Sequence, residues 1–228
     1  MTPDFWHQRW LKGDIGWHQT AINPHLQAYW PPAGVIPGAQ VLVPLCGKSS
    51  DMLWLAGEGY RVLGVEISQA GVEAFFAENG LHPVIRREPP FHRYGADEIE
   101  ILCGDFFDLH PDQTRDATAL FDRASLIALP PDMRQAYVAH LKSLLMPEAS
   151  GLLITLDYEQ REMAGPPFAV PPDEVQALLG RRFTLTEIAV LDLHAVTSRY
   201  RERGLSRMLE RVYGLSPLTD PTQIAAAQ

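Results

Sequence analysis

The stretch "QVLVPLCGKSSDM", residues 40–52, places a short apolar run directly before a loop that contains a glycine and a lysine. A continuous apolar run bounded by loop residues is typical of a strand that is buried on both faces. The residues after the lysine read as the start of a helix. In open α/β sheets the loop after such a strand is the usual ligand site, so we expect an α/β fold with its ligand beside this loop.

Gly47, Lys48 and Ser49 repeat the end of the phosphate-binding P-loop pattern G-x-x-x-x-G-K-[ST]. The first glycine of that pattern would fall on Leu42, which lies inside the predicted strand. The chain cannot make there the curl that turns backbone N–H groups toward phosphate oxygens. The loop also lacks the pattern G-x-G-x-x-G. A nucleotide hydrolase is therefore disfavoured, and a bound pyrophosphate is poorly supported.

The composition is that of an acidic globular chain. It has 228 residues, of which 46% are hydrophobic, and a formal net charge of -9 at pH 7. This length suits one large α/β domain or two small ones, and the negative charge argues against nucleic acid as the main partner. The first residues lack the pattern of a signal peptide, and no apolar run approaches a membrane span. We therefore expect a cytoplasmic protein without a membrane partner.

The spacing of cysteine and histidine indicates neither a disulfide nor a metal. Cys46 and Cys103 stand far apart and form no C-x-x-C pair, which favours two reduced thiols. Cys46 lies in the loop after the first strand, where simple packing and a reactive role are both open. The eight histidines show no ligand pattern such as H-E-x-x-H, so no metal site is expected.

Apolar segments alternate with helix signals through the middle of the chain. Five strands are expected there, at residues 41–45, 61–66, 99–103, 117–122 and 151–157. Residues 82–98 are rich in proline and glycine and read as a loop or a hairpin. Two strand-like runs then follow each other, at 183–193 and 207–213. This order predicts a doubly wound, mostly parallel seven-stranded sheet with an antiparallel strand at one edge.

The whole chain, residues 1–228, is expected to form a single domain. Within it we expect an N-terminal helical cover at 1–35, an α/β core at 36–213 and a flexible tail at 214–228. Four of the five tryptophans lie in the cover: Trp6, Trp10, Trp17 and Trp30. They fit either a helix pinned to the body by large aromatic rings or a lid over a flat or cationic ligand. Both interpretations stay open.

Glu66 ends the second predicted strand, 19 residues after Gly47. An acidic residue at this place in a strand–helix–strand unit accepts hydrogen bonds from ribose hydroxyls, although a plain surface carboxylate would also fit. A ribose site without a pyrophosphate loop favours S-adenosylmethionine over NAD. Asp105 and Phe106 follow the third strand, where an adenine ring could be hydrogen-bonded and stacked.

Six segments carry a more specific pattern: "FWHQRWLKGDIGWHQ" (5–19), "VPLCGKSSDM" (43–52), "GVEIS" (64–68), "FDRASLIALPP" (121–131), "GPPFAVP" (165–171) and "SRYRERG" (198–204). On these segments the chain resembles bacterial thiopurine S-methyltransferases nearly end to end. That family has the fold of S-adenosylmethionine-dependent methyltransferases and carries PLCGK in place of a glycine-rich loop. The resemblance therefore implies a monomeric S-methyltransferase that uses S-adenosylmethionine and acts on aromatic or heterocyclic thiols such as thiopurines. It extends the expectation to selenium and tellurium species.

The resemblance also implies roles for individual residues. The cofactor contacts of the family fall on Trp10, Leu45, Glu66 and Arg123. Its acceptor contacts fall on Trp17, Phe168 and Arg199. Arg123 and Arg199 are the candidates that would orient the substrate, and no proton acceptor is implied.

Several points stay open at the level of sequence. Animal members of the family carry phenylalanine at the position of Trp17, so their acceptor range does not transfer to this chain. Five arginines recur with a spacing near two residues: Arg199, Arg201, Arg203, Arg207 and Arg211. This spacing is typical of the solvated face of an edge hairpin. Two other classes of function remain: a non-catalytic sensor that binds S-adenosylmethionine, and a small-molecule N- or O-methyltransferase.

Overall fold

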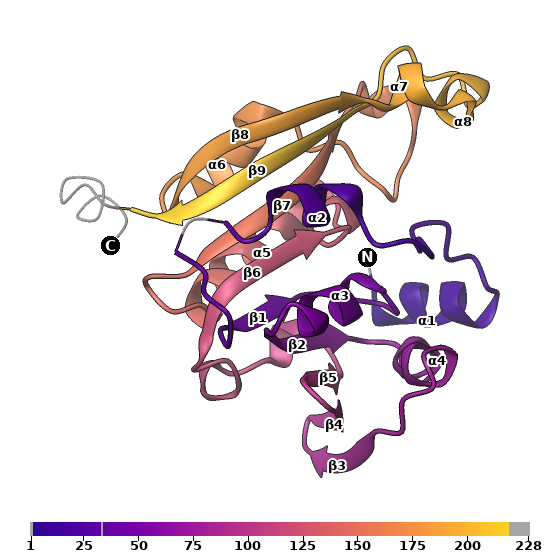
Figure 1. The fold of residues 1–228 in the computed structure, drawn as a ribbon. Helices are drawn as coiled ribbons and strands as arrows, with labels where there is room; N and C mark the ends of the chain where they lie inside the picture. The colour runs from indigo at the N-terminus through magenta and orange to yellow at the C-terminus, as the bar shows by residue number, and fades with distance from the viewer. Residues whose placement is uncertain (1, 33, 219–228) are drawn as a thin grey trace.

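The computed structural model describes residues 2–32 and 34–218, apart from the side chain of Arg199. Its centre is a nine-stranded sheet in the order β3-β4-β5-β2-β1-β6-β7-β9-β8 (Figure 1). The strands are β1 (Gln40–Val43), β2 (Arg61–Glu66), β3 (Val84–Glu88), β4 (Phe91–Ala96), β5 (Ile99–Cys103), β6 (Ala117–Arg123), β7 (Ser150–Asp157), β8 (Phe183–Asp192) and β9 (Leu209–Pro217). The helices are α1 (Pro3–Leu11), α2 (Pro24–Tyr29), α3 (Asp51–Gly57), α4 (Gln69–Glu78), α5 (Pro131–Leu144), α6 (Pro172–Leu179), α7 (Leu193–Val196) and α8 (Ser198–Glu202).

The middle of the sheet is parallel and is covered on both faces. β5, β2, β1, β6 and β7 run in one direction, and every residue of β7 is buried. Along β1, Leu42 belongs to the core formed with α5 and α6, whereas Val41 and Val43 belong to the core formed with α3 and α4. A strand covered on both faces must be apolar throughout, which explains the apolar run of residues 41–43.

The predicted fold class is confirmed, but the sheet has nine strands rather than seven. The two additional strands are β3 and β4, which form a hairpin within residues 82–98, and β4 pairs antiparallel with β5. Val84 and Ile85 of β3 are adjacent apolar residues that are both exposed. The strand therefore has no alternating apolar pattern that would distinguish it from a loop.

The antiparallel strand expected at the edge beyond β7 is β9, and it lies second from that edge. β9 pairs antiparallel with β7 on one side and with β8 on the other, so β8 is the edge strand. β9 continues to Pro217, beyond the core boundary that was expected at residue 213. The rest of the predicted tail, residues 219–228, lies outside the described residues.

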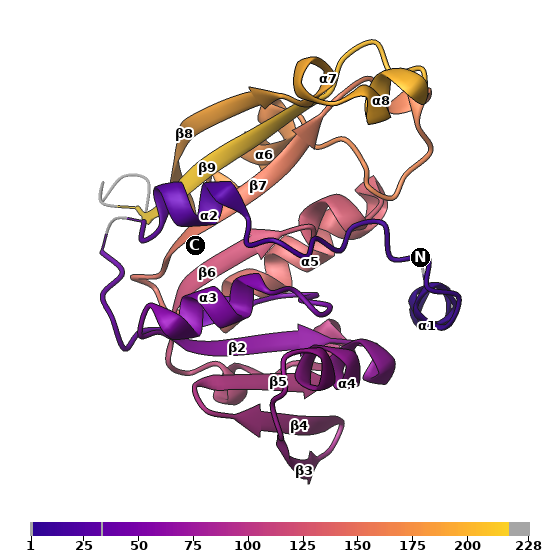
Figure 2. The ribbon, with the colours of Figure 1, turned by 45° about the vertical axis from the view of Figure 1, so that its right-hand side comes forward.

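The N-terminal segment and the C-terminal helices meet at the carboxyl end of the parallel strands. Both ribbon views place α1, α7 and α8 at the end toward which the arrows of β2 and β7 point (Figure 1, Figure 2). Within residues 2–32 and 34–218, no helix has the length and apolar character of a membrane span. Ligands of open α/β sheets bind at this end of the strands, so the fold places the N-terminal helix α1 and the helices α7 and α8 near the expected site (Figure 1, Figure 2).

Candidate active site

A cavity of about 260 Å³ lies at the carboxyl ends of the central strands. Its walls come from the N-terminal segment, the ends of β1, β2 and β6, the loop after β7, and the segment that leads from α8 into β9. Five residues that the sequence singled out line it together: Trp10, Trp17, Leu45, Glu66 and Arg123. The fold thus brings most of the predicted site residues into one space.

The loop after β1 turns sharply at two residues with positive φ. Leu45 has a φ of 46°, which residues with a side chain rarely adopt, and Gly47 has a φ of 55°. The Cys46 N–H donates to the Val65 carbonyl oxygen at 2.9 Å, and the Gly47 N–H donates to Glu66 Oε2 at 2.9 Å. Because that N–H already serves a carboxylate, this loop does not form the phosphate cradle of a P-loop.

Glu66 places a buried carboxylate in the cavity wall at the end of β2. It is 5% exposed and accepts hydrogen bonds from the N–H groups of Gly47 and Ser68, at 2.9 and 2.8 Å, and from the Trp10 side chain. Burial raises the pKa of Glu66 to about 7, although these hydrogen bonds act in the opposite direction. A carboxylate held in this way can accept further hydrogen bonds from ligand hydroxyls.

Trp10 and Trp17 form an aromatic part of the wall. Their rings meet edge to face, with centroids 6.1 Å apart. The Trp10 ring lies against the backbone of Gly71 in α4, where an added Cβ would be 2.8 Å from Cζ2. The absence of a side chain at Gly71 therefore lets the indole approach Glu66. An indole face at a cavity wall can attract a cationic ligand.

Arg123 ends β6 and brings a positive charge to the cavity. Its Nη2 donates to the Trp17 carbonyl oxygen at 3.4 Å. Burial lowers the pKa of Arg123, while the nearby acidic groups of Asp51, Glu210 and Tyr200 act in the opposite direction. A guanidinium keeps its proton in proteins, so the cavity holds a fixed positive charge.

The predicted acceptor residues differ in their relation to the cavity. Trp17 lines it, and so do Pro166 and Pro167 of the loop after β7. Phe168 does not line it, because its ring packs near Arg134, whose guanidinium carbon is 6.0 Å from the ring centroid. The Gly-Pro-Pro-Phe loop therefore contacts the cavity through its prolines.

The arginine-rich segment 198–204 contains α8 and is not part of an edge hairpin. The interpretation of most of the five arginines as one solvated face of an edge hairpin is therefore wrong for this segment. The side chain of Arg199 lies outside the described residues, but its neighbour Tyr200 and the nearby Arg203 both line the cavity. The segment is thus close to the site, while the role of Arg199 stays a prediction.

The predicted adenine contacts, Asp105 and Phe106, are not among the residues that line the cavity. Asp105 accepts a hydrogen bond from the Phe107 N–H at 3.0 Å and caps a short 3-10 helix, Phe106–Asp108. Phe106 is 1% exposed and packs on Tyr137 with ring centroids 5.1 Å apart. Its ring is committed to the core, so the stacking interpretation of Phe106 is wrong. The cofactor contact of Asp105 stays a prediction.

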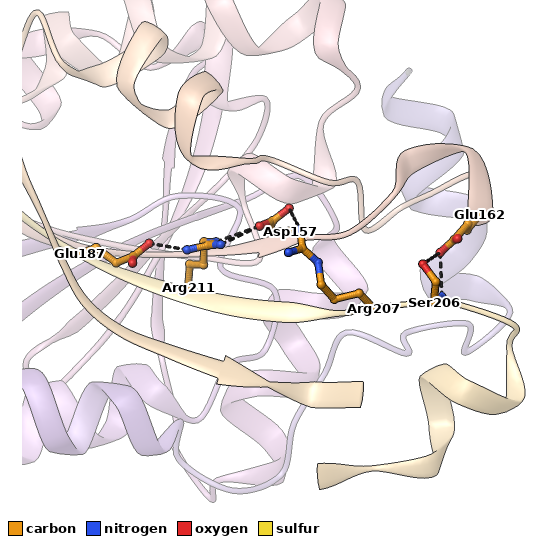
Figure 3. A network of polar contacts seen from close by, with 6 residues as sticks. All are labelled: Asp157, Glu162, Glu187, Ser206, Arg207 and Arg211. Carbon is orange, nitrogen blue, oxygen red and sulfur yellow. Dashed lines mark hydrogen bonds and ion pairs between the residues drawn. The ribbon is translucent and has the colours of Figure 1, made fainter. Parts of the chain in front are cut away.

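Ion pairs and hydrogen bonds join the end of β7 and its following loop to the start of β9. Asp157, at the end of β7, binds Arg207 at 3.1 Å and Arg211 at 2.9 Å, and Arg211 also binds a glutamate of β8 (Figure 3). Glu162, in the loop after β7, accepts hydrogen bonds from the N–H and the hydroxyl of Ser206, at 2.9 and 3.0 Å (Figure 3). These contacts fix the loop after β7 to the start of β9.

Sequence reasoning missed several polar residues of the cavity wall, among them His18 and Glu210. His18 directly follows Trp17, so the position of Trp17 could have predicted that His18 lies near the site. Burial, followed by the charge of Lys48, lowers the pKa of His18. Glu210 gave no local signal, because its partner His25 is 185 residues away in the sequence.

Comparison with solved structures identifies the fold. The 1,6-didemethyltoxoflavin-N1-methyltransferase of Burkholderia thailandensis matches with a TM-score of 0.60 and 16% identity, over 94% of this chain and 87% of that chain. A SAM-dependent methyltransferase from Methanosarcina mazei matches with a TM-score of 0.61 and 16% identity, over 87% of this chain and 99% of that chain. The fold is therefore that of the class I S-adenosylmethionine-dependent methyltransferases.

Comparison of sequences then identifies the family. The family model described as thiopurine S-methyltransferase (TPMT) matches residues 1–217. The thiopurine S-methyltransferase of Pseudomonas fluorescens is 49% identical over 215 residues, which is 94% of this chain and 99% of that protein. This chain belongs to the thiopurine S-methyltransferase family, whose cofactor is S-adenosylmethionine.

Proposed function

We propose that this protein transfers the methyl group of S-adenosylmethionine to the sulfur of an aromatic or heterocyclic thiol, such as a thiopurine. The observation that carries the proposal is a single cavity that joins Trp10, Leu45 and Glu66 to a second wall from the loop after β7 and α8, with Arg123 in its lining. The name of the 49% identical relative supports sulfur as the acceptor atom.

The cavity residues suit the chemistry of this cofactor. Glu66 is a carboxylate that is only 5% exposed, and such a group needs hydrogen-bond donors such as the two hydroxyls of a ribose. Trp10 offers an aromatic face to a sulfonium. Arg123 offers a positive charge to a carboxylate or to an anionic acceptor. Leu45, held at positive φ, turns the backbone of its loop along the cavity.

Arg123 is the residue that stabilises the negative charge of the bound acceptor. The bound cofactor supplies a methyl group on a positively charged sulfur. A thiolate is the reactive form of the acceptor, and its burial is costly without a positive partner. Its negative charge falls as the new bond forms, so Arg123 acts by raising the bound fraction of thiolate and by fixing its direction.

The walls of the cavity hold the reactants in line and keep water out. Trp6 and Trp17, with ring centroids 5.5 Å apart, form a hydrophobic side in the N-terminal segment. Pro166 and Pro167 form a rigid side in the loop after β7. Orientation of donor and nucleophile lowers the barrier of a two-reactant step, and exclusion of water strengthens the charge interactions around the thiolate.

The test is an acceptor panel with product analysis by mass spectrometry. The panel contains 6-mercaptopurine, an aromatic amine, a phenol and a selenol, each incubated with S-adenosylmethionine. We expect the methyl thioether of 6-mercaptopurine, and we expect Arg123→Ala to lower kcat/KM by about tenfold to 100-fold. The matched control is Arg86→Ala on the exposed strand β3, which should behave as the wild type.

The panel also separates the alternatives. Methylation of the amine or the phenol alone would favour an N- or O-methyltransferase and reject the proposal. Tight cofactor binding without any product would favour a sensor and reject it as well. Action on selenium or tellurium, a monomeric state and a cytoplasmic location remain predictions, as do the acceptor contacts of Phe168 and Arg199.

A further inference from the structure

Glu210 places a negative charge in the same cavity as Arg123. It lies near the start of β9 and lines the cavity together with Ile154 and Leu156 of β7. The register of the two strands pairs Glu210 with Leu156, and the next pair on the same face of the sheet is Val212 with Ile154. Because paired residues share a face of the sheet, the side chain of Glu210 belongs to the face that forms the cavity wall.

The carboxylate of Glu210 is held by a contact from α2. Its Oε2 lies 2.8 Å from His25 Nε2, and the two side chains are 17% and 11% exposed. The His25 ring stacks on Tyr29 with centroids 6.0 Å apart. The backbone N–H of His25 donates to Oδ1 of Asn23, which caps α2, at 2.9 Å. His25 thereby fixes the direction of the carboxylate. Within the described residues, no hydrogen bond occupies the second oxygen of Glu210.

The opposite charges of Arg123 and Glu210 do not neutralise each other directly. They are close enough for Glu210 to influence the pKa of Arg123. Among the described residues, however, the nearest ion-pair partner of Glu210 is His25, and the guanidinium of Arg123 donates to the Trp17 carbonyl oxygen. A carboxylate and a guanidinium that are both partly buried in one cavity can therefore both contact a ligand between them.

The ligand that complements such a pair carries a negative atom and an N–H donor on one rigid frame. A purine thiolate has this pattern, because its sulfur is anionic while its imidazole ring keeps one N–H. A carbocyclic thiolate such as thiophenolate has the sulfur but no donor. A site that hydrogen-bonds a substrate N–H discriminates strongly against an analogue without it, since the acceptor of the site is then left unpaired.

We propose that Glu210, positioned by His25, is a specificity-determining residue that favours acceptor thiols with a ring N–H over thiols whose ring has none. This inference rests on the proposed S-methyltransferase function. It assigns Arg123 to the sulfur and Glu210 to the ring of the acceptor. His25 is a positioning residue that acts only through the carboxylate.

The test compares 6-mercaptopurine, which has a ring N–H, with thiophenol, which has none. For each acceptor we would measure kcat/KM, or the inhibition constant against 6-mercaptopurine where an acceptor is not turned over. Glu210→Gln should lower kcat/KM for 6-mercaptopurine about 10- to 100-fold. It should change kcat/KM, or the inhibition constant, for thiophenol by no more than about twofold. Glu98→Gln, an equal change of charge at an exposed residue beside β5, is the control that should match the wild type.

The role of His25 has its own signature. His25→Ala should reduce the preference for 6-mercaptopurine in the same direction, and His25→Gln should restore part of it, because an amide N–H can still donate to Glu210. An equal loss for both acceptors in Glu210→Gln, or an unchanged preference, would overturn the inference. Failure of the wild type to methylate either thiol would instead refute the proposed function.

Discussion

Lowering the pH from 8 to 6 should weaken the binding of S-adenosylhomocysteine about tenfold through Glu66. Burial raises the pKa of Glu66 to about 7. The group is then roughly 90% ionised at pH 8 and roughly 10% ionised at pH 6. The ionised form is the better acceptor of ribose hydroxyls, and apparent affinity scales with the fraction of protein in the competent form. The ratio of the two fractions is about nine, or close to 1.3 kcal/mol.

Isothermal titration calorimetry at three pH values measures this effect. S-adenosylhomocysteine is the ligand because it lacks the sulfonium and stays unreacted. Glu66→Gln keeps the shape of the side chain but does not titrate. Its single oxygen cannot accept from the N–H groups of both Gly47 and Ser68, so we expect weaker binding than in the wild type at pH 8, with a flatter pH profile.

Two results would refute the reasoning about Glu66. An affinity of the wild type that does not change between pH 6 and pH 8 would mean that its ionisation does not control binding. An equally steep profile in Glu66→Gln would assign the pH dependence to another group, such as His18, whose pKa is lowered by burial and by the charge of Lys48.

Three further predictions concern stability and the cavity wall. The ligand-free protein should lose up to about 3 kcal/mol of unfolding free energy through Glu66 as the pH rises from 4.5 through 7, because the native carboxyl keeps a proton there that the unfolded chain releases. Urea titrations should show this loss in the wild type but not in Glu66→Gln, and the same pH dependence of unfolding free energy in both proteins would exclude it. Gly71→Ala would place a Cβ 2.8 Å from Cζ2 of Trp10 and displace the indole, so calorimetry should show cofactor affinity reduced about tenfold. Gly57→Ala, where a Cβ meets nothing within 4 Å, is the control that should leave the affinity unchanged, and equal affinities of the two variants would contradict the role given to the indole. Arg211→Ala removes one of the two partners of the buried carboxylate at the end of β7 and should lower the unfolding free energy in urea by about 2 kcal/mol; a change below about 0.5 kcal/mol would show that the network adds no stability.

The core of the fold was predictable because its strands are buried on both faces. Residues 61–66 and 99–103 coincide with β2 and β5, since a short apolar run between loop signals is typical of a buried strand. Residues 82–98 left a loop and a hairpin both open, because an exposed edge strand such as β3 needs no apolar face. The mostly parallel, doubly wound class of the sheet followed from the alternation of strands and helices, which restricts the topologies that a chain can adopt.

The site was predictable where the motif sets the position of a residue and not where the tertiary fold does. Glu66 and Arg123 end parallel strands, so the fold alone brings them to one edge of the sheet. Phe106 also follows a strand, but the packing of α5 turns its ring into the core, and no local pattern shows that choice. Glu210 acquires its place through His25, a contact between opposite ends of the chain.

The most direct test of the central claim follows a labelled methyl group. The protein is incubated with S-adenosylmethionine that carries a trideuterated methyl, together with 6-mercaptopurine, and the product is fragmented in a mass spectrometer. The proposed function predicts one trideuteromethyl group on the sulfur, and a strongly reduced yield with Arg123→Ala but not with Arg86→Ala. A label on a ring nitrogen, or no labelled product while the cofactor still binds, would contradict it.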